Sequence, residues 1–164
     1  MFSVADAEWF DIDGVPFPTF QSDVPWRCTD PTPLWDGPDV RGTDEQISEA
    51  TGDRARLRFA SGSMRPVGLF IDGHFDLDGN QLVGSLSDFR AQLLSAVRFL
   101  RANVVDPLTT GDGTRYLTYH MPDGSVWGGY VHVISPLHLT SNGVECDAIL
   151  QVSIVKGALE ELGP

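Results

Sequence analysis

The residues from Val144 to Val155 alternate between apolar and polar side chains over an unusually long stretch. One face has the apolar side chains Val144, Cys146, Ala148, Leu150, Val152 and Ile154. The other face has Glu145, Asp147, Gln151 and Ser153, with Ile149 and Val155 as apolar exceptions. A period of two is typical of a strand with one buried and one wetter face. Because strands average about five to six residues, this length predicts a large sandwich or barrel, or a sheet continued by a neighbouring subunit.

The size and charge of the chain limit its fold and its partners. With 164 residues, of which 41 % are hydrophobic, the chain is expected to form one domain with a substantial core. It has 23 acidic against 11 basic side chains, a formal net charge of −12. This excess argues against nucleic acid as a tight partner, because phosphate binding needs clustered Lys and Arg. The acidity serves either solubility or a surface that repels DNA.

The cysteines and the N-terminus indicate where such a protein resides. Cys146 falls on the apolar face of the last strand and is expected to be buried, whereas Cys28 falls in a proline-rich stretch. No CxxC pattern occurs, which argues against a zinc site. Residues 1–14 are acidic, without a long apolar run, so we expect no signal peptide and no membrane anchor. A protein located or assembled in the cytoplasm follows.

The first fifty residues differ in pattern from the rest, so we predict a boundary between residues 1–50 and 51–164. Pro16 and Pro18 interrupt an aromatic-rich stretch, which indicates an edge strand or hairpin. Residues 23–53 lack periodicity but contain Trp26 and Trp35. Such a segment is either an arm that packs on a neighbouring subunit, with these two tryptophans as anchors, or a loop packed on its own core.

The remaining sequence predicts strands and one helix. A stripe at helical spacing predicts a helix at about 87–103, capped by Ser85 or Ser87 and formed by Phe89, Leu93, Ala96, Val97, Leu100 and Val104. Alternation predicts strands at 54–59, 66–77, 115–121 and 126–139 before the last one. We therefore predict a mainly β fold, a β-sandwich or rolled antiparallel sheet, with one flanking α-helix.

No catalytic or metal-binding motif stands out. Asp76-Leu77-Asp78-Gly79 resembles half a calcium loop, but the acids required at its first and twelfth positions are missing, so a turn is the better interpretation. His120 and His132 could approach each other across a hairpin, yet a third ligand is lacking. Paired acids fall in loops or in the tail. The sequence predicts no enzyme, no metal and no cofactor.

Residues 51–159 resemble tail structural proteins of long-tailed bacteriophages, in the tail-tube and distal-tail group and especially those of actinobacteriophages. The similarity rests on the order of several segments: Thr51-Gly52-Asp53-Arg54, the strand from Val67 to Asp76, the helix from Asp88 to Asn103, Val104-Val105-Asp106-Pro107, Thr110 to Arg115, and the closing strand.

This resemblance implies a β-sandwich or rolled sheet with a flanking helix, assembled as a hexameric ring. Sheets of neighbouring subunits would join into an inner barrel, through which DNA passes without specific binding. The protein would contact adjacent tail proteins and no membrane, and it would reside in the virion tail after assembly in the host cytoplasm. Glu145, Asp147, Gln151 and Ser153 are then candidates for the channel wall, and Trp26 and Trp35 for the inter-subunit arm.

Two other classes of function remain open. Trp127, Tyr130 and Tyr119 fall on neighbouring predicted strands and could form an aromatic platform, as in a monomeric β-sandwich carbohydrate-binding module. A hydrolase with scattered catalytic acids is the third reading. Oligomeric state separates the ring protein from the module, and a substrate screen tests the hydrolase.

Overall fold

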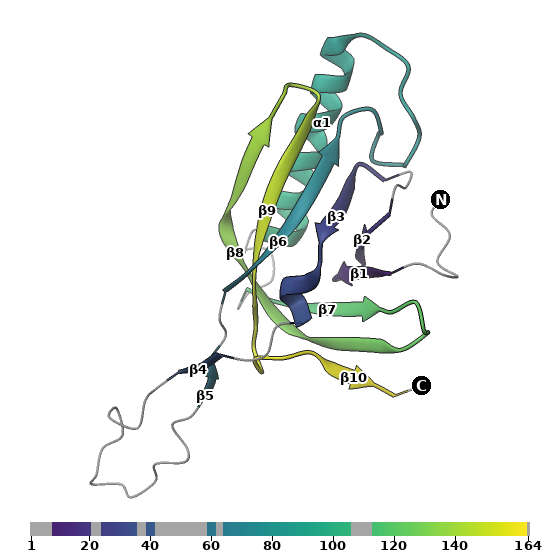
Figure 1. The fold of residues 1–164 in the computed structure, drawn as a ribbon. Helices are drawn as coiled ribbons and strands as arrows, with labels where there is room; N and C mark the ends of the chain where they lie inside the picture. Colours follow the sequence, from purple (N-terminus) through teal and green to yellow (C-terminus); the bar gives the residue numbers. More distant parts are fainter. Residues whose placement is uncertain are drawn as a thin grey trace, which may run out of the picture.

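The computed structural model describes residues 8–20, 24–35, 39–41, 59–61, 64–105 and 113–163 (Figure 1). Within them, eight strands form one antiparallel sheet in the order β2-β1-β7-β8-β9-β6-β3, with β10 paired to β8. These strands are β1 (Trp9–Ile12), β2 (Val15–Pro18), β3 (Trp26–Asp30), β6 (Met64–Asp72), β7 (Thr114–His120), β8 (Val126–Ser141), β9 (Glu145–Ile154) and β10 (Glu160–Leu162). Two further strands, β4 (Asp39–Arg41) and β5 (Phe59–Ser61), pair with each other. The mainly β prediction is confirmed.

The N-terminal hairpin forms because its turn residues accept positive φ angles. Asp13 and Gly14 have φ angles of 49° and 83°, as a two-residue type I′ turn requires. Pro16 and Pro18 lie in β2 at the end of the sheet order, where a missing N–H removes no ladder hydrogen bond. The predicted edge hairpin is therefore confirmed, although β1 itself is paired on both sides, with β2 and β7.

The sheet is rolled until its two ends nearly meet. β2 and β3 are the last strands of the order, and the indole Nε1 of Trp26 in β3 donates to the carbonyl of Pro16 in β2 at 2.9 Å. The rolled sheet encloses the core, which draws buried side chains from every strand between these two ends. The predicted rolled antiparallel sheet is confirmed.

The alternation that predicted β9 is visible in its burial. Cys146, Ala148, Leu150, Val152 and Ile154 are all buried on the core face. Both neighbours in the sheet are long: β6 pairs with β9 from Met64 to Asp72, and β8 pairs with it from Val131 to Ser141 around an irregularity. The length of β9 is thus matched within this chain by two strands of similar reach.

The helix α1 (Leu86–Leu100) lies behind the β8–β9–β6 part of the sheet and continues as a π-helical turn, η5 (Arg101–Val105) (Figure 1). Ser85 is the N-cap and forms a capping box with Asp88. The buried side chains are the predicted stripe from Leu93 to Val104, whereas Phe89 is half-buried. The helix predicted at about 87–103 is confirmed. No helix in the described ranges is both long and apolar enough to cross a lipid bilayer.

The first fifty residues contribute to the same core as the rest. β1 pairs with β7, and β3 pairs with β6, so the N-terminal strands belong to the sheet that the sequence placed in residues 51–164. A short 3₁₀ helix, η1 (Thr32–Trp35), follows β3 and buries Leu34. The strand predicted at residues 54–59 lies outside the described residues apart from Phe59, which begins β5.

Candidate functional site

The candidate site lies on the side of the sheet that faces away from the core. Side chains at directly opposed positions of neighbouring strands share a face. Glu145, Asp147, Ile149, Gln151 and Ser153 of β9 therefore share a face with their partners in β6, which are Asp72, Phe70, Gly68, Pro66 and Met64. Arg27 in β3 and Thr140 in β8 extend this row. We call this set the outer face.

The four predicted channel residues all lie on the outer face, but they differ in exposure. Asp147 is exposed, Glu145 and Gln151 are half-buried, and Ser153 is buried, with 8 % of its surface exposed. The two apolar exceptions to the alternation also differ. Ile149 belongs to the outer face and is 40 % exposed, whereas Val155 follows the end of β9. Ser153 is thus corrected from a candidate surface residue to a buried one.

Trp26 and Trp35 do not lie on a projecting arm. Trp26 is 4 % exposed, and its indole stacks on Phe99 of α1 with ring centroids 4.8 Å apart. Trp35 packs edge-on against Tyr119 and Trp127, at 4.7 Å and 5.5 Å between ring centroids. The structure therefore agrees with the alternative prediction, in which this segment packs on its own core. The prediction that Trp26 and Trp35 anchor an inter-subunit arm is wrong for these two residues. Residues 36–38 and 42–53 of the predicted arm lie outside the described residues.

The predicted aromatic platform is not assembled. Tyr119 is fully buried and Trp127 packs against the core, whereas Tyr130 is 59 % exposed. Tyr130 instead meets Tyr116 edge-on, with ring centroids 5.0 Å apart. One exposed tyrosine with one neighbour offers a smaller stacking surface than the three rings that the sequence suggested.

Strand register decides whether His120 and His132 meet, and hydrogen bonds decide whether the Asp76 segment is a turn. His120 pairs with Val126 and His132 pairs with Thr114, so the two histidines lie at opposite ends of the β7–β8 ladder. They do not approach each other. The Asp76 side chain accepts hydrogen bonds from the backbone N–H groups of Asp78 (3.0 Å) and Asn80 (2.9 Å), which makes the segment a turn, as predicted.

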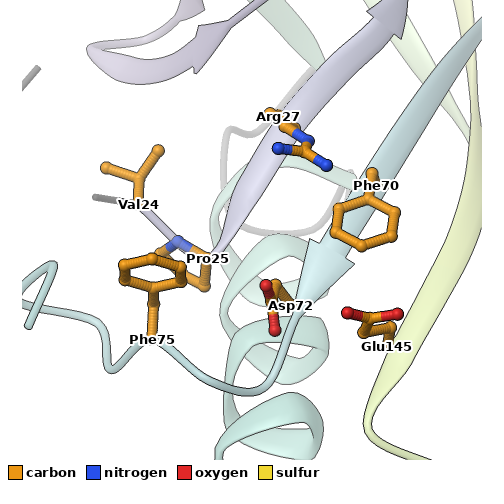
Figure 2. A pocket seen from close by; sticks show the side chains of 7 residues that line it. All are labelled: Val24, Pro25, Arg27, Phe70, Asp72, Phe75 and Glu145. Atoms are coloured by element: carbon orange, nitrogen blue, oxygen red, sulfur yellow. The ribbon is translucent and has the colours of Figure 1, made fainter. Parts of the chain in front are cut away.

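A hollow of about 190 Å³ lies where β3, β6 and β9 end beside one another (Figure 2). It is lined by Val24, Pro25, Arg27, Phe70, Asp72, Phe75 and Glu145. Figure 2 shows the carboxylates of Asp72 and Glu145 side by side, with the Phe70 ring and Arg27 one rung along the sheet. The Arg27 guanidinium lies 4.4 Å from the centre of the Phe70 ring, a cation–π contact.

His74 lies beside the two carboxylates of this hollow and contacts Asp72. Its ring nitrogen Nδ1 lies 2.5 Å from Oδ1 of Asp72, and its backbone N–H donates to the same oxygen at 2.8 Å. Asp72, His74 and Glu145 each place a possible ligand atom within 4.8 Å of the other two, and all three residues are half-buried. Among the described residues, this cluster brings together the clearest set of groups able to bind a ligand.

The thiols and the buried phenol are poorly suited to nucleophilic chemistry. Burial raises the pKa of Cys28 to about 12 and that of Cys146 to about 11, so both are protonated at neutral pH. Both cysteines are free and buried, as predicted for Cys146, and Cys28 belongs to β3. The pKa of the Tyr119 hydroxyl is also raised, mainly by burial and to a lesser extent by its hydrogen bond to Glu8.

The comparisons with known proteins gave no match to a family model, a curated protein or a solved structure. The sequence had singled out Glu145 but had missed Asp72 and His74 as its neighbours. An Asp-x-His pattern inside the strand predicted at 66–77 is a weak signal by itself. The pairing of Glu145 with Asp72 becomes visible only in the register of β6 against β9.

Proposed function

We propose that this chain is a structural virion protein that assembles into a ring in the tail of a long-tailed bacteriophage, around the DNA channel. The proposal rests on the outer face together with the resemblance in sequence. On the side of the sheet opposite the core, Ile149 is 40 % exposed two residues from the exposed Asp147, and Met64 is 54 % exposed at the other end of the β6–β9 ladder. An antiparallel sheet with one packed and one open face suits a wall that is completed by neighbouring copies.

The charge of the outer face supports its assignment to the channel. Asp72, Glu145 and Asp147 occupy neighbouring positions on β6 and β9, and Arg27 is the basic side chain beside them. A negative wall repels phosphates, so DNA passes along it without sticking. The net charge of −12 acts in the same direction.

The test of this assignment is the orientation of the sheet in an assembled particle. A cryo-EM reconstruction of rings or tubes is expected to show Glu145 and Asp147 lining the lumen. The same side chains on the outside of the ring would refute the assignment of this face to the channel.

A charge-reversal variant tests the same assignment in solution. Asp147→Arg in an assembled ring is expected to retain DNA at low salt, with binding that weakens as salt is raised. Glu161→Arg is the matched control, because it makes the same charge change at an exposed position on β10, away from β9. Equal DNA retention by both variants would contradict a channel role for Asp147.

The carbohydrate-binding alternative has a separate signature. It predicts a stable monomer that binds a glycan, with Tyr130 as the exposed ring. Loss of glycan binding in Tyr130→Ala, together with a monomeric mass, would favour that module over the ring.

A further inference from the structure

We propose that Asp72, His74 and Glu145 bind a divalent transition-metal cation, and that Zn²⁺ is the ion that best matches this set of donors. The proposal does not depend on the ring function, because a bound ion would offset the charges of Asp72 and Glu145 and leave Asp147 as the uncompensated acid of the outer face. It starts from the geometry, because the three possible ligand atoms all lie within 4.8 Å of one another. Donors around a tetrahedral Zn²⁺ lie about 3.4 Å apart, so small side-chain rotations bring these three into a coordination shell.

The site holds two carboxylates, and the ionisable group paired with one of them is His74, whose Nδ1 lies 2.5 Å from Oδ1 of Asp72. Asp72 and Glu145 are directly opposed across the β6–β9 ladder, where like charges destabilise a sheet. Among the described residues, no Lys or Arg forms an ion pair with either carboxylate. Arg27, the basic side chain that lines the hollow, contacts the Phe70 ring. A bound divalent cation would turn the repulsion between the two carboxylates into a shared attraction.

Backbone hydrogen bonds and ring packing fix the positions of Asp72, the last residue of β6, and of His74, two residues beyond it. The N–H of Asp72 donates to the carbonyl of Pro25 at 2.7 Å, and the N–H of Gly73 donates to the carbonyl of Val144 at 2.9 Å. The His74 ring packs against Phe89 of α1, with ring centroids 4.6 Å apart. Rigid support of this kind lowers the entropic cost of ordering ligands around an ion.

The donor chemistry selects the class of metal. One imidazole nitrogen with two carboxylates suits Zn²⁺ and its first-row neighbours, whereas Mg²⁺ and Ca²⁺ prefer all-oxygen shells with more ligands. The side chain of His74 is 38 % exposed, which leaves the site open to solvent. Three protein ligands thus leave one position for water or for a group from a partner.

Calorimetric titration of the untagged full chain with ZnCl₂ tests the proposal. We expect one saturable site per chain, with no comparable binding of Mg²⁺ or Ca²⁺. His74→Gln and Glu145→Gln are each expected to weaken Zn²⁺ binding by at least about tenfold. Absence of saturable Zn²⁺ binding to the wild-type chain would overturn the proposal without any variant.

Two control variants separate ligation from general loss of charge or histidine. His132→Gln removes an exposed histidine on β8, and Asp147→Asn removes the next acid of the outer face; both should bind Zn²⁺ as the wild type does. Co²⁺ gives a second readout, since visible absorption bands from nitrogen and oxygen ligands should appear in the wild type and weaken in His74→Gln. Equal Zn²⁺ affinity in His74→Gln, Glu145→Gln and the controls would overturn the proposed site.

Discussion

Gly73 occupies a position where no side chain fits, and its substitution tests how closely the helix and the sheet are packed. A Cβ atom at Gly73 would lie 2.3 Å from the carbonyl oxygen of Phe89 in α1 and 2.7 Å from that of Val144 before β9. Both obstacles are backbone atoms, so neither can rotate away. Gly73→Ala would therefore push α1 and the β8–β9 turn away from the end of β6.

The expected cost follows from two contributions. Ordinary contacts begin at 3.4 Å, so both carbonyl oxygens would have to move away from the new Cβ atom. A close-packed interior resists such movement. Overpacking of this kind costs about 1–3 kcal/mol. The Gly73 N–H hydrogen bond to Val144 at 2.9 Å is weakened as well, which adds about 1 kcal/mol. We predict a loss of about 3 kcal/mol in the free energy of unfolding, or a fall in Tm of about 6–12 °C.

Urea unfolding monitored by circular dichroism measures this loss, and Gly129→Ala is the matched control. A Cβ at Gly129 in β8 would lie 3.5 Å from Leu159 and 3.8 Å from Ile154, which are ordinary contacts. We expect Gly129→Ala to change stability by less than about 1 kcal/mol, with a gain possible because alanine restricts the unfolded chain. A Gly73→Ala protein as stable as Gly129→Ala would refute the close approach of α1 to β6.

Four further predictions concern the core, the thiols, the helix cap and its pH dependence. Trp26→Ala should cost about 3–5 kcal/mol in urea unfolding; a loss below about 1 kcal/mol would show that the indole is not packed in the core. Because burial raises the pKa of Cys28 to about 12 and of Cys146 to about 11, a disulfide reagent at pH 8 should label neither thiol before unfolding and both after it; rapid labelling of the native chain contradicts their burial. Ser85→Ala should lower stability by about 1 kcal/mol in thermal melts, through loss of the N-cap, and an unchanged melt would argue against the capping box. Hydrogen bonds from Ser85 lower the pKa of Asp88 below its ordinary 3.8, so the ionised Asp88 stabilises the fold above that pH, and this stabilisation is lost as pH falls through the folded-state pKa. The wild type should therefore lose more stability than Asp88→Asn between pH 6 and pH 3. Parallel losses in the two proteins would contradict this.

Local periodicity was enough to predict the helix and the strands β6, β7, β8 and β9 of the core. β9 and α1 each bury the residues that the sequence places on one face, because burial of a stripe is decided within one element. The prolines of β2 are likewise a local signal, and the edge hairpin forms as they indicate.

Features that depend on contacts between distant segments were not predictable in the same way. Trp26 and Trp35 lie in a stretch without periodicity, and only the pairing of β3 with β6 shows that this stretch belongs to the core. The burial of Tyr119 and Trp127 depends on which side of the rolled sheet faces the core, whereas the odd and even positions of Trp127 and Tyr130 in one strand already place them on opposite faces. The Asp72, His74 and Glu145 cluster depends on the same kind of long-range register.

The molar mass of the untagged chain in solution, measured by light scattering over a range of concentrations, tests the ring assignment most directly. The account predicts a concentration-dependent rise from 17.9 kDa for one chain to a closed ring of about 107 kDa for six, or to longer tubes. Negative-stain images of the same sample should then show rings or tubes with a central hole. A mass that stays at 17.9 kDa at every concentration, with no rings on the grid, would contradict the account.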